Sequence, residues 1–185
     1  MTLRWFRLPV MVVLSVAVAG ASVHSDKRGA QIRRALSAAP AAIAARAMVA
    51  IRGKNGKWII LRHGDDGWTC IPASSGDPDP LPACFDANGL VFIEAFDTGH
   101  PPDPNKPGYS YMLQGGSAWS NLDPFAAKLP PGAKDYIHIP PHIMILDAKI
   151  ANESGLPLKD AHPDTRRPFV MFGGTKYAIL IIPVQ

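Results

Sequence analysis

The sequence contains few cysteines and none of the local motifs that define the common enzyme families. Among 185 residues only Cys70 and Cys84 are cysteines, and they form no Cys-x-x-Cys motif. Nucleophile-elbow, zinc-protease, Walker and dinucleotide-binding motifs are absent as well. These absences remove the motif-defined hydrolases and nucleotide-binding enzymes from consideration. They do not exclude an enzyme whose site is assembled from distant segments.

The sequence also lacks an apolar run long enough to span a membrane. The N-terminal run of residues 8–19 is shorter than the about 20 residues that a spanning helix needs. Two arginines precede this run and a small-x-small sequence ending at Ala21 follows it, which is the pattern of a signal peptide. We predict that residues 1–21 are a signal peptide, cleaved after Ala21, and that the protein is periplasmic or secreted. An uncleaved inner-membrane anchor is the alternative.

Acidic residues are scarce in the first part of the mature chain. Residues 22–64 contain nine lysines and arginines against one acid, whereas residues 65–185 contain eight basic residues against fourteen acids. The mature chain is therefore nearly neutral but polarised along its length. We expect no nucleic-acid partner and interpret residues 22–36 as a basic flexible segment. This segment is either solvated beside the acidic body or in weak contact with an anionic membrane surface.

The two cysteines lie fourteen positions apart, after the predicted signal peptide. In an oxidising compartment an even number of cysteines at short spacing indicates a disulfide. A loop of this length gains about 3 kcal/mol of stability in the chain-entropy model. No histidine adjoins either cysteine, so we predict a structural Cys70–Cys84 disulfide in preference to a redox-active or metal-binding thiol pair.

Proline and glycine, with 19 and 16 residues, divide the chain into short elements. Lys54-Asn55-Gly56 between two β-rich runs predicts a hairpin, and residues 68–71 predict a third strand that continues it as a meander. One helix is expected to start at Ser37 as its N-cap, with Pro40 in its first turn. Further helices are expected at residues 85–96 and 148–153. Strands are expected at residues 47–51, 57–61, 68–71, 109–114, 142–146, 169–172 and 177–182, with residues 117–141 mostly irregular.

The mature chain, at roughly 160 residues, is long enough for one domain with a core but hardly for two. Short hydrophobic strands separated by proline and glycine turns, without regular βαβ alternation, indicate the α+β class. We predict a single domain over residues 37–185. It has a mostly antiparallel sheet, two or three short helices and long Pro/Gly-rich loops.

Two histidine patterns suggest metal ligands. His138 and His142 are four residues apart, but the two prolines between them exclude the helix that would bring both imidazoles to one ion. His142 and Met144 share one face of a predicted strand and, with Met112 and Met171 on other strands, form a ligand set suited to Cu(I). Methionine on a strand is more often a core residue than a ligand. We therefore predict no metal and no cofactor.

The most distinctive polar cluster is Ser120-Asn121-Leu122-Asp123-Pro124. Such residues next to proline commonly hydrogen-bond their own backbone, which predicts a turn. The alternative places Asn121 and Asp123 on the rim of a pocket with His142, where a carboxylate could orient an imidazole for acid or base catalysis. No catalytic residue is assigned. The candidate ligand-binding residues are Tyr111, Ser120, Asn121, Asp123 and His142.

Several short motifs occur in a defined order from about Ala38 to the C-terminus. They are Gly67-Trp-Thr-Cys70, Tyr111-Met-Leu-Gln-Gly115, Ser120-Asn-Leu-Asp-Pro124, Pro141-His-Ile-Met-Ile145, Val170-Met171, Gly174-Thr175, Tyr177-Ala178 and Ile182-Pro-Val184. This order resembles a family of uncharacterised bacterial exported proteins, and the resemblance implies a secreted or periplasmic single domain without an assigned activity. The family tends to have Trp, Pro and His where Phe172, Lys176 and Ile179 stand here, so a site built on that histidine together with His142 is incomplete in this chain.

Together these features predict an exported ligand-binding or structural module, with a small molecule as the expected type of ligand. One alternative is a hydrolase or metal-dependent enzyme with a site around Asn121, Asp123 and His142. The other is an envelope-associated interaction protein that uses the basic N-terminal segment.

Overall fold

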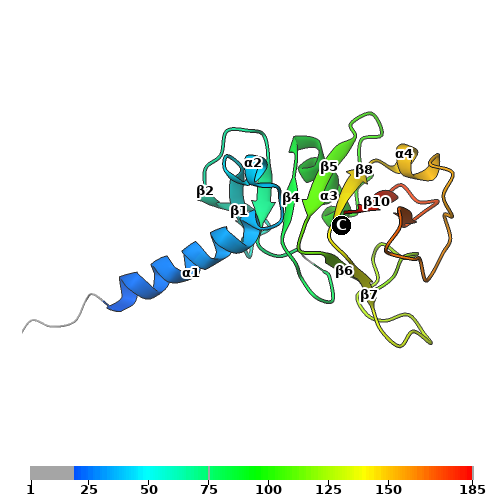
Figure 1. The fold of residues 1–185 in the computed structure, drawn as a ribbon, viewed down its shortest axis with the longest axis horizontal. Coiled ribbons are helices and arrows are strands. Elements are labelled where there is room, and N and C mark those ends of the chain that lie inside the picture. The colour runs from blue at the N-terminus through cyan, green and yellow to red at the C-terminus, as the bar shows by residue number, and fades with distance from the viewer. Residues whose placement is uncertain (1–18, 75, 185) are drawn as a thin grey trace, which may run out of the picture.

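An eight-stranded sheet forms the centre of the protein. The structure, a computed structural model, describes residues 19–184 except residue 75, so most of the predicted signal peptide lies outside the described residues (Figure 1). The architecture confirms the expected α+β fold with a mostly antiparallel sheet. In spatial order the strands are β2 (Trp58–Arg62), β1 (Met48–Arg52), β3 (Thr69–Ile71), β4 (Ala83–Phe85), β5 (Gly108–Met112), β8 (His142–Leu146), β10 (Ile179–Pro183) and β9 (Phe169–Met171).

Every strand expected from the sequence is present, within a few residues of its expected ends. The Asn55-Gly56 hairpin joins β1 and β2, with Gly56 at a φ of 74° as this turn requires. Three short strands were not expected. They are β4 in the main sheet and the two strands of a separate small sheet, β6 (Gly116–Ala118) and β7 (Ile137–Ile139).

The prediction of a β-meander is wrong, because β3 pairs with β1 instead of β2 and runs parallel to β1. After β2 the chain crosses directly over the start of β1. At the crossing, a Cβ on Gly64 would lie 2.1 Å from the backbone nitrogen of Met48, so only glycine fits there. The Met48 N–H then donates to the Trp68 carbonyl, and the parallel pairing begins. β2 is left as an edge strand of the sheet.

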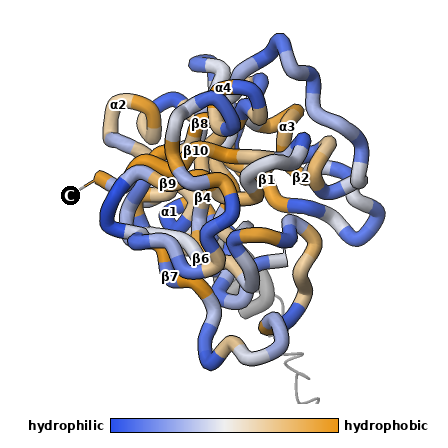
Figure 2. The backbone as a smooth tube through the Cα atoms, turned by 90° about the vertical axis from the view of Figure 1, so that its right-hand side faces the viewer, coloured by the Kyte–Doolittle hydropathy of each residue, from blue (hydrophilic) through white to orange (hydrophobic). Residues whose placement is uncertain are grey.

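Helices cover both faces of the sheet. One face packs against α1 (Ala19–Leu36), α2 (Ala41–Ala44) and α4 (Ala148–Asn152), and the other packs against α3 (Ala87–Thr98) and the β6–β7 sheet. Side chains alternate between the faces, so that His142, Met144 and Leu146 of β8 all point to the α3 side. Hydrophobic residues are concentrated in the central strands, and hydrophilic residues occupy the outer loops (Figure 2).

The basic segment of residues 22–36, expected to be flexible, is helical and forms most of α1. The N-terminal part of this helix extends away from the body, whereas its C-terminal end lies against the sheet (Figure 1). Arg28 donates from Nη2 to the carbonyl of Leu61 at 2.6 Å, and Arg34 donates to the carbonyl of Pro80 at 2.8 Å. These contacts, together with the buried side chain of Ala35, hold the helix on the protein.

Ser37 does not cap the second helix, contrary to expectation. It closes the end of α1 instead, because its hydroxyl donates to the carbonyl of Arg34 at 2.8 Å. The N-cap of α2 is Pro40, which has no amide hydrogen and an extended ψ of 150°. The helix therefore starts three residues later than predicted.

α3 lies close against β5 because two glycines face each other. A Cβ on Gly108 of β5 would lie 2.3 Å from the backbone nitrogen of Gly89 in α3. Asp86 caps the helix and joins the two elements, since its Oδ1 accepts from the amides of Gly89 at 2.7 Å and Tyr109 at 2.9 Å. The left-handed Gly99 ends the helix. This packing fixes the position of α3 over the sheet.

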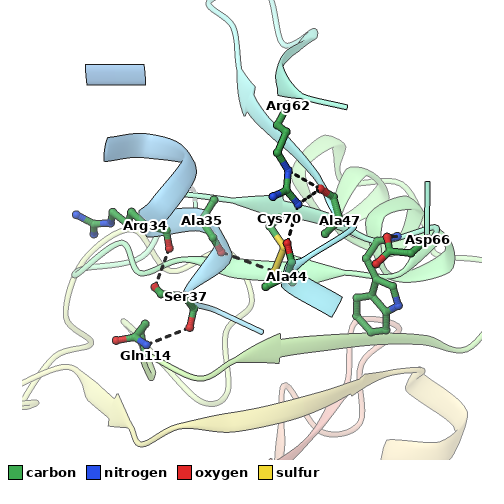
Figure 3. The surroundings of a disulfide bond; sticks show 11 residues. Arg34, Ala35, Ser37, Ala44, Ala47, Arg62, Asp66, Cys70 and Gln114 are labelled. Atoms are coloured by element: carbon green, nitrogen blue, oxygen red, sulfur yellow. Dashed lines mark hydrogen bonds between the residues drawn. A yellow bond between two sulfur atoms is a disulfide. The ribbon is translucent and has the colours of Figure 1, made fainter. Parts of the chain in front are cut away.

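The Cys70–Cys84 disulfide is present, as predicted. The two cysteines are direct cross-strand partners in the antiparallel pair β3–β4, with their Cα atoms 3.9 Å apart. The bond lies on the α1 side of the sheet, and the Sγ of Cys84 is 3.7 Å from the carbonyl oxygen of Ala35 (Figure 3). The disulfide thus closes the Pro-rich loop of residues 72–82 at its base.

Candidate binding cavity

A cavity of about 880 Å³ lies between the sheet and the segments that cover its α3 side. Its floor consists of inward-facing residues of β3, β4, β5, β8, β9 and β10. Its walls are α3, the disulfide-closed loop of residues 72–80 and the segment 116–127. Ser117 joins the last two, because its hydroxyl donates to the Asp79 carbonyl and accepts from the Asp79 amide. Trp119 adds an indole N–H bond to the Gly76 carbonyl at 3.0 Å.

Most of the cavity wall is hydrophobic, and aromatic rings are prominent in it. Phe96 of α3 is the centre of one group, with ring centroids 5.6 Å from Phe125 and 5.8 Å from Phe172. Phe172 has a φ of 58°, which is unusual for a bulky residue. Its amide donates to the carbonyl of Asn121 at 2.8 Å, which holds this conformation. The aromatic residues that line the cavity are Trp58, Phe85, Phe96, Trp119, Phe125 and Phe172.

His142 provides a polar group on the floor. Its side chain is buried, at 1% exposure, and its Nδ1 lies 2.8 Å from the carbonyl oxygen of Pro140. Because a carbonyl only accepts, Nδ1 carries the proton and Nε2 has a free lone pair. Burial lowers the pKa of His142, although the Pro140 carbonyl opposes this shift. The imidazole is therefore a neutral acceptor.

Asp77 is a cavity residue that the sequence reasoning missed. Burial raises the pKa of Asp77 to about 6, with a further contribution from the negative charge of Asp97. The hydroxyl of Ser74 donates to Oδ2 of Asp77 and opposes the shift. From the sequence, the predicted disulfide indicates that residues 72–82 form a closed loop. No local sequence pattern indicates that this loop folds over the α3 side of the sheet.

A charged group lies at one side of the cavity, where β1 and α3 meet. The guanidinium of Arg52 lies 4.0 Å from the ring centroid of Trp58 and 3.1 Å from Oδ2 of Asp97. The indole N–H of Trp58 donates to Oε1 of Glu94 at 2.6 Å. The cation–π contact and the hydrogen bond fix the orientation of the Trp58 ring in the wall.

The structure brings three of the five predicted ligand-binding residues to the cavity, namely Ser120, Asp123 and His142. Ser120 and Asp123 also form the turn that was the other interpretation. The Ser120 hydroxyl accepts from the amides of Leu122 and Asp123 at 3.0 Å each, and Oδ1 of Asp123 accepts from the Phe125 amide at 2.9 Å. Asp123 is exposed, so its carboxylate retains acceptor capacity.

Asn121 and Tyr111 lie outside the cavity lining. The buried Asn121 side chain donates to the carbonyls of Asp160 at 2.8 Å and Val170 at 3.0 Å, so it tethers a loop to β9. Tyr111 points to the α1 side of the sheet, where its ring lies 5.3 Å from that of Trp68. Neither residue is placed to contact a ligand that occupies the cavity.

The fold and cavity define an α+β domain with a largely apolar internal space beside its sheet. No protein-family model, curated protein or solved structure matches the chain. Within residues 19–184, no three His, Cys, Asp or Glu side chains lie together as a metal site would require. In the same part of the chain, none of the helices has the length and apolar character needed to cross a membrane.

Proposed function

We propose that the protein is an exported protein that binds a small, largely apolar molecule in the cavity beside its sheet. The observation that carries the proposal is the cavity itself. Its volume of about 880 Å³ lies within the range of small-molecule sites, and it combines aromatic and aliphatic walls with a few polar groups. The signal-like N-terminus and the disulfide support export, because disulfides persist in oxidising compartments.

The charges around the cavity favour a ligand with a hydrogen-bond donor or a positive charge. Asp77, Asp97 and Asp123 contribute carboxylates, against the single guanidinium of Arg52, which already pairs with Asp97. Aromatic faces such as that of Trp119 also attract cations. An apolar amine therefore matches the cavity better than an apolar acid of the same shape.

Fewer structural observations support the two alternative functions. An enzymatic site on Asn121, Asp123 and His142 would need the amide of Asn121, which is bonded to backbone carbonyls away from the cavity. An interaction surface on the basic segment would lose two of its cations, because Arg28 and Arg34 bond carbonyls of the protein itself. We therefore rank both functions below the binding of a small molecule.

A matched pair of probes tests the proposed function. 1-Naphthylmethylamine and 1-naphthoic acid share a ring system but carry opposite charges at pH 7. Binding is followed through the fluorescence of Trp58 and Trp119, which both line the cavity. We expect the amine to bind at least about tenfold more tightly, which corresponds to roughly 1.4 kcal/mol.

Two variants locate the binding. Ala118→Phe adds a ring at a buried position of the cavity wall and should weaken amine binding severalfold. Ala161→Phe adds the same ring at an exposed position outside the cavity lining and should leave binding unchanged. If neither probe binds the wild-type protein, or if Ala118→Phe binds as the wild type does, the proposal is refuted.

A further inference from the structure

Two methionines and a histidine converge on the floor of the cavity. Met112 of β5 is the direct cross-strand partner of His142 of β8, and both side chains point to the α3 side. Met144 follows two residues later on the same face of β8. All three side chains line the cavity, and none is more than 8% exposed. The antiparallel register therefore places two thioethers beside one imidazole.

The imidazole is oriented as a ligand would be. Metal-binding histidines usually donate their second ring N–H to a carbonyl or carboxylate, which fixes the tautomer. In His142 the Nδ1 proton is directed to the Pro140 carbonyl, so the lone pair on Nε2 is available.

Gly116 lets the imidazole and one thioether come close to its backbone. A Cβ at this position would lie 3.0 Å from Cε1 and 3.7 Å from Nε2 of His142, and 3.4 Å from the Cε methyl of Met112. The imidazole edge and the methionine methyl thus lie close together beside a residue that has no side chain. Gly116 does not have a positive φ, so its backbone conformation does not require glycine. The close contact with His142 accounts for the glycine, because a larger residue would crowd the imidazole.

We propose that Met112, His142 and Met144 form a binding site for a soft monovalent cation, Cu(I). Two thioethers and a neutral imidazole suit such an ion, whereas harder divalent ions prefer carboxylate and other oxygen ligands. The site goes beyond the proposed binding of an organic molecule, although both would occupy the same cavity. A group of one histidine and two methionines also differs from the clusters of histidine, cysteine and carboxylate that hold most divalent metals.

Met171 provides a matched internal control. It lines the same cavity from β9, but the register separates it from the proposed site. On β10, which lies between β8 and β9, Pro183 is opposite His142, whereas Ile179 is opposite Met171. Pro183 and Ile179 are four residues apart, which corresponds to about 13 Å along the strand. Met171 is therefore too far away to share an ion with His142.

The test uses the purified, disulfide-intact protein with methyl-labelled methionine, and Ag(I) serves as a redox-stable substitute for Cu(I). We expect one equivalent of Ag(I) to shift the methyl NMR signals of Met112 and Met144 and to leave that of Met171 in place. Competition with a chromophoric Cu(I) chelator then gives the affinity for Cu(I) itself. Absence of binding at one equivalent, or equal shifts of all three signals, overturns the proposal.

Conservative variants complete the test. Met112→Leu and Met144→Leu each remove one thioether at nearly constant volume, so the fold should tolerate them. Each is expected to weaken Cu(I) binding at least tenfold, whereas Met171→Leu should have no effect. Equal loss in all three variants, or no loss in any of them, contradicts the site. Because no organic probe is present, failure here leaves the proposed small-molecule binding untouched.

Discussion

Replacing Asp77 with asparagine should stabilise the protein at pH 8 and change its stability little at pH 4. Asp77 lies in the cavity wall, where burial raises its pKa from 3.8 to about 6. At pH 8 the folded protein therefore holds a carboxylate that it accommodates poorly. Asparagine has a similar shape and no charge, and its amide oxygen can still accept the hydrogen bond from Ser74.

The sign and size of the effect follow from proton linkage. Between about pH 4 and pH 6 the folded state binds more protons at Asp77 than the unfolded state does, so stability falls as the pH rises. Below this window both states are protonated, and above it both are ionised. A shift of about two pKa units corresponds to a loss of roughly 3 kcal/mol between the two limits. The asparagine variant should lack this loss.

The assay is urea denaturation of both proteins at intervals from pH 4 to pH 8. The difference between their unfolding free energies isolates Asp77, because groups common to both proteins, such as His142, cancel. Asp79→Asn is the control, since Asp79 is an exposed residue of the same loop. A difference between wild type and Asp77→Asn that stays constant across this pH range would refute the argument that burial raises the pKa of Asp77.

Two further predictions concern the fold. Replacing Cys70 and Cys84 together with alanine should lower the unfolding free energy by about 3 kcal/mol, measured by urea denaturation, and an unchanged urea midpoint would contradict the stabilising role of the bond. Gly108→Ala should destabilise the protein by roughly 2 kcal/mol or more, because its Cβ would lie 2.3 Å from the Gly89 nitrogen and force α3 away from the sheet. A thermal midpoint equal to that of the wild type would show that α3 shifts without cost.

The sequence predicts those parts of the fold that local patterns determine. Asn55-Gly56 between β-rich runs predicts the β1–β2 hairpin, because this dipeptide adopts the positive φ values of the turn. The spacing of hydrophobic residues around Phe92 predicts α3, and Asp86 supplies its cap. The disulfide follows from the cysteine number and the compartment that the N-terminus predicts.

Other features depend on contacts between distant segments. The parallel pairing of β1 with β3 needs the close crossing at Gly64, which no local pattern indicates. The three-residue strands β4, β6 and β7 are too short to show a clear alternation. The same limit applies to the cavity. His142 was predicted from its strand, whereas Asp77 reaches the cavity only through the path of its loop over the sheet.

The position of α1 bears on the predicted cleavage after Ala21. As described, the helix runs from Ala19 to Leu36 and includes this position, so cleavage would remove residues 19–21 from it. The contacts that hold α1 on the protein are made further along, by Arg28, Arg34 and Ala35. A chain that starts at residue 22 therefore keeps these contacts, and its remaining helix can stay docked. Through the Arg34 bond to Pro80, the retained part of α1 also supports the loop that forms one wall of the cavity.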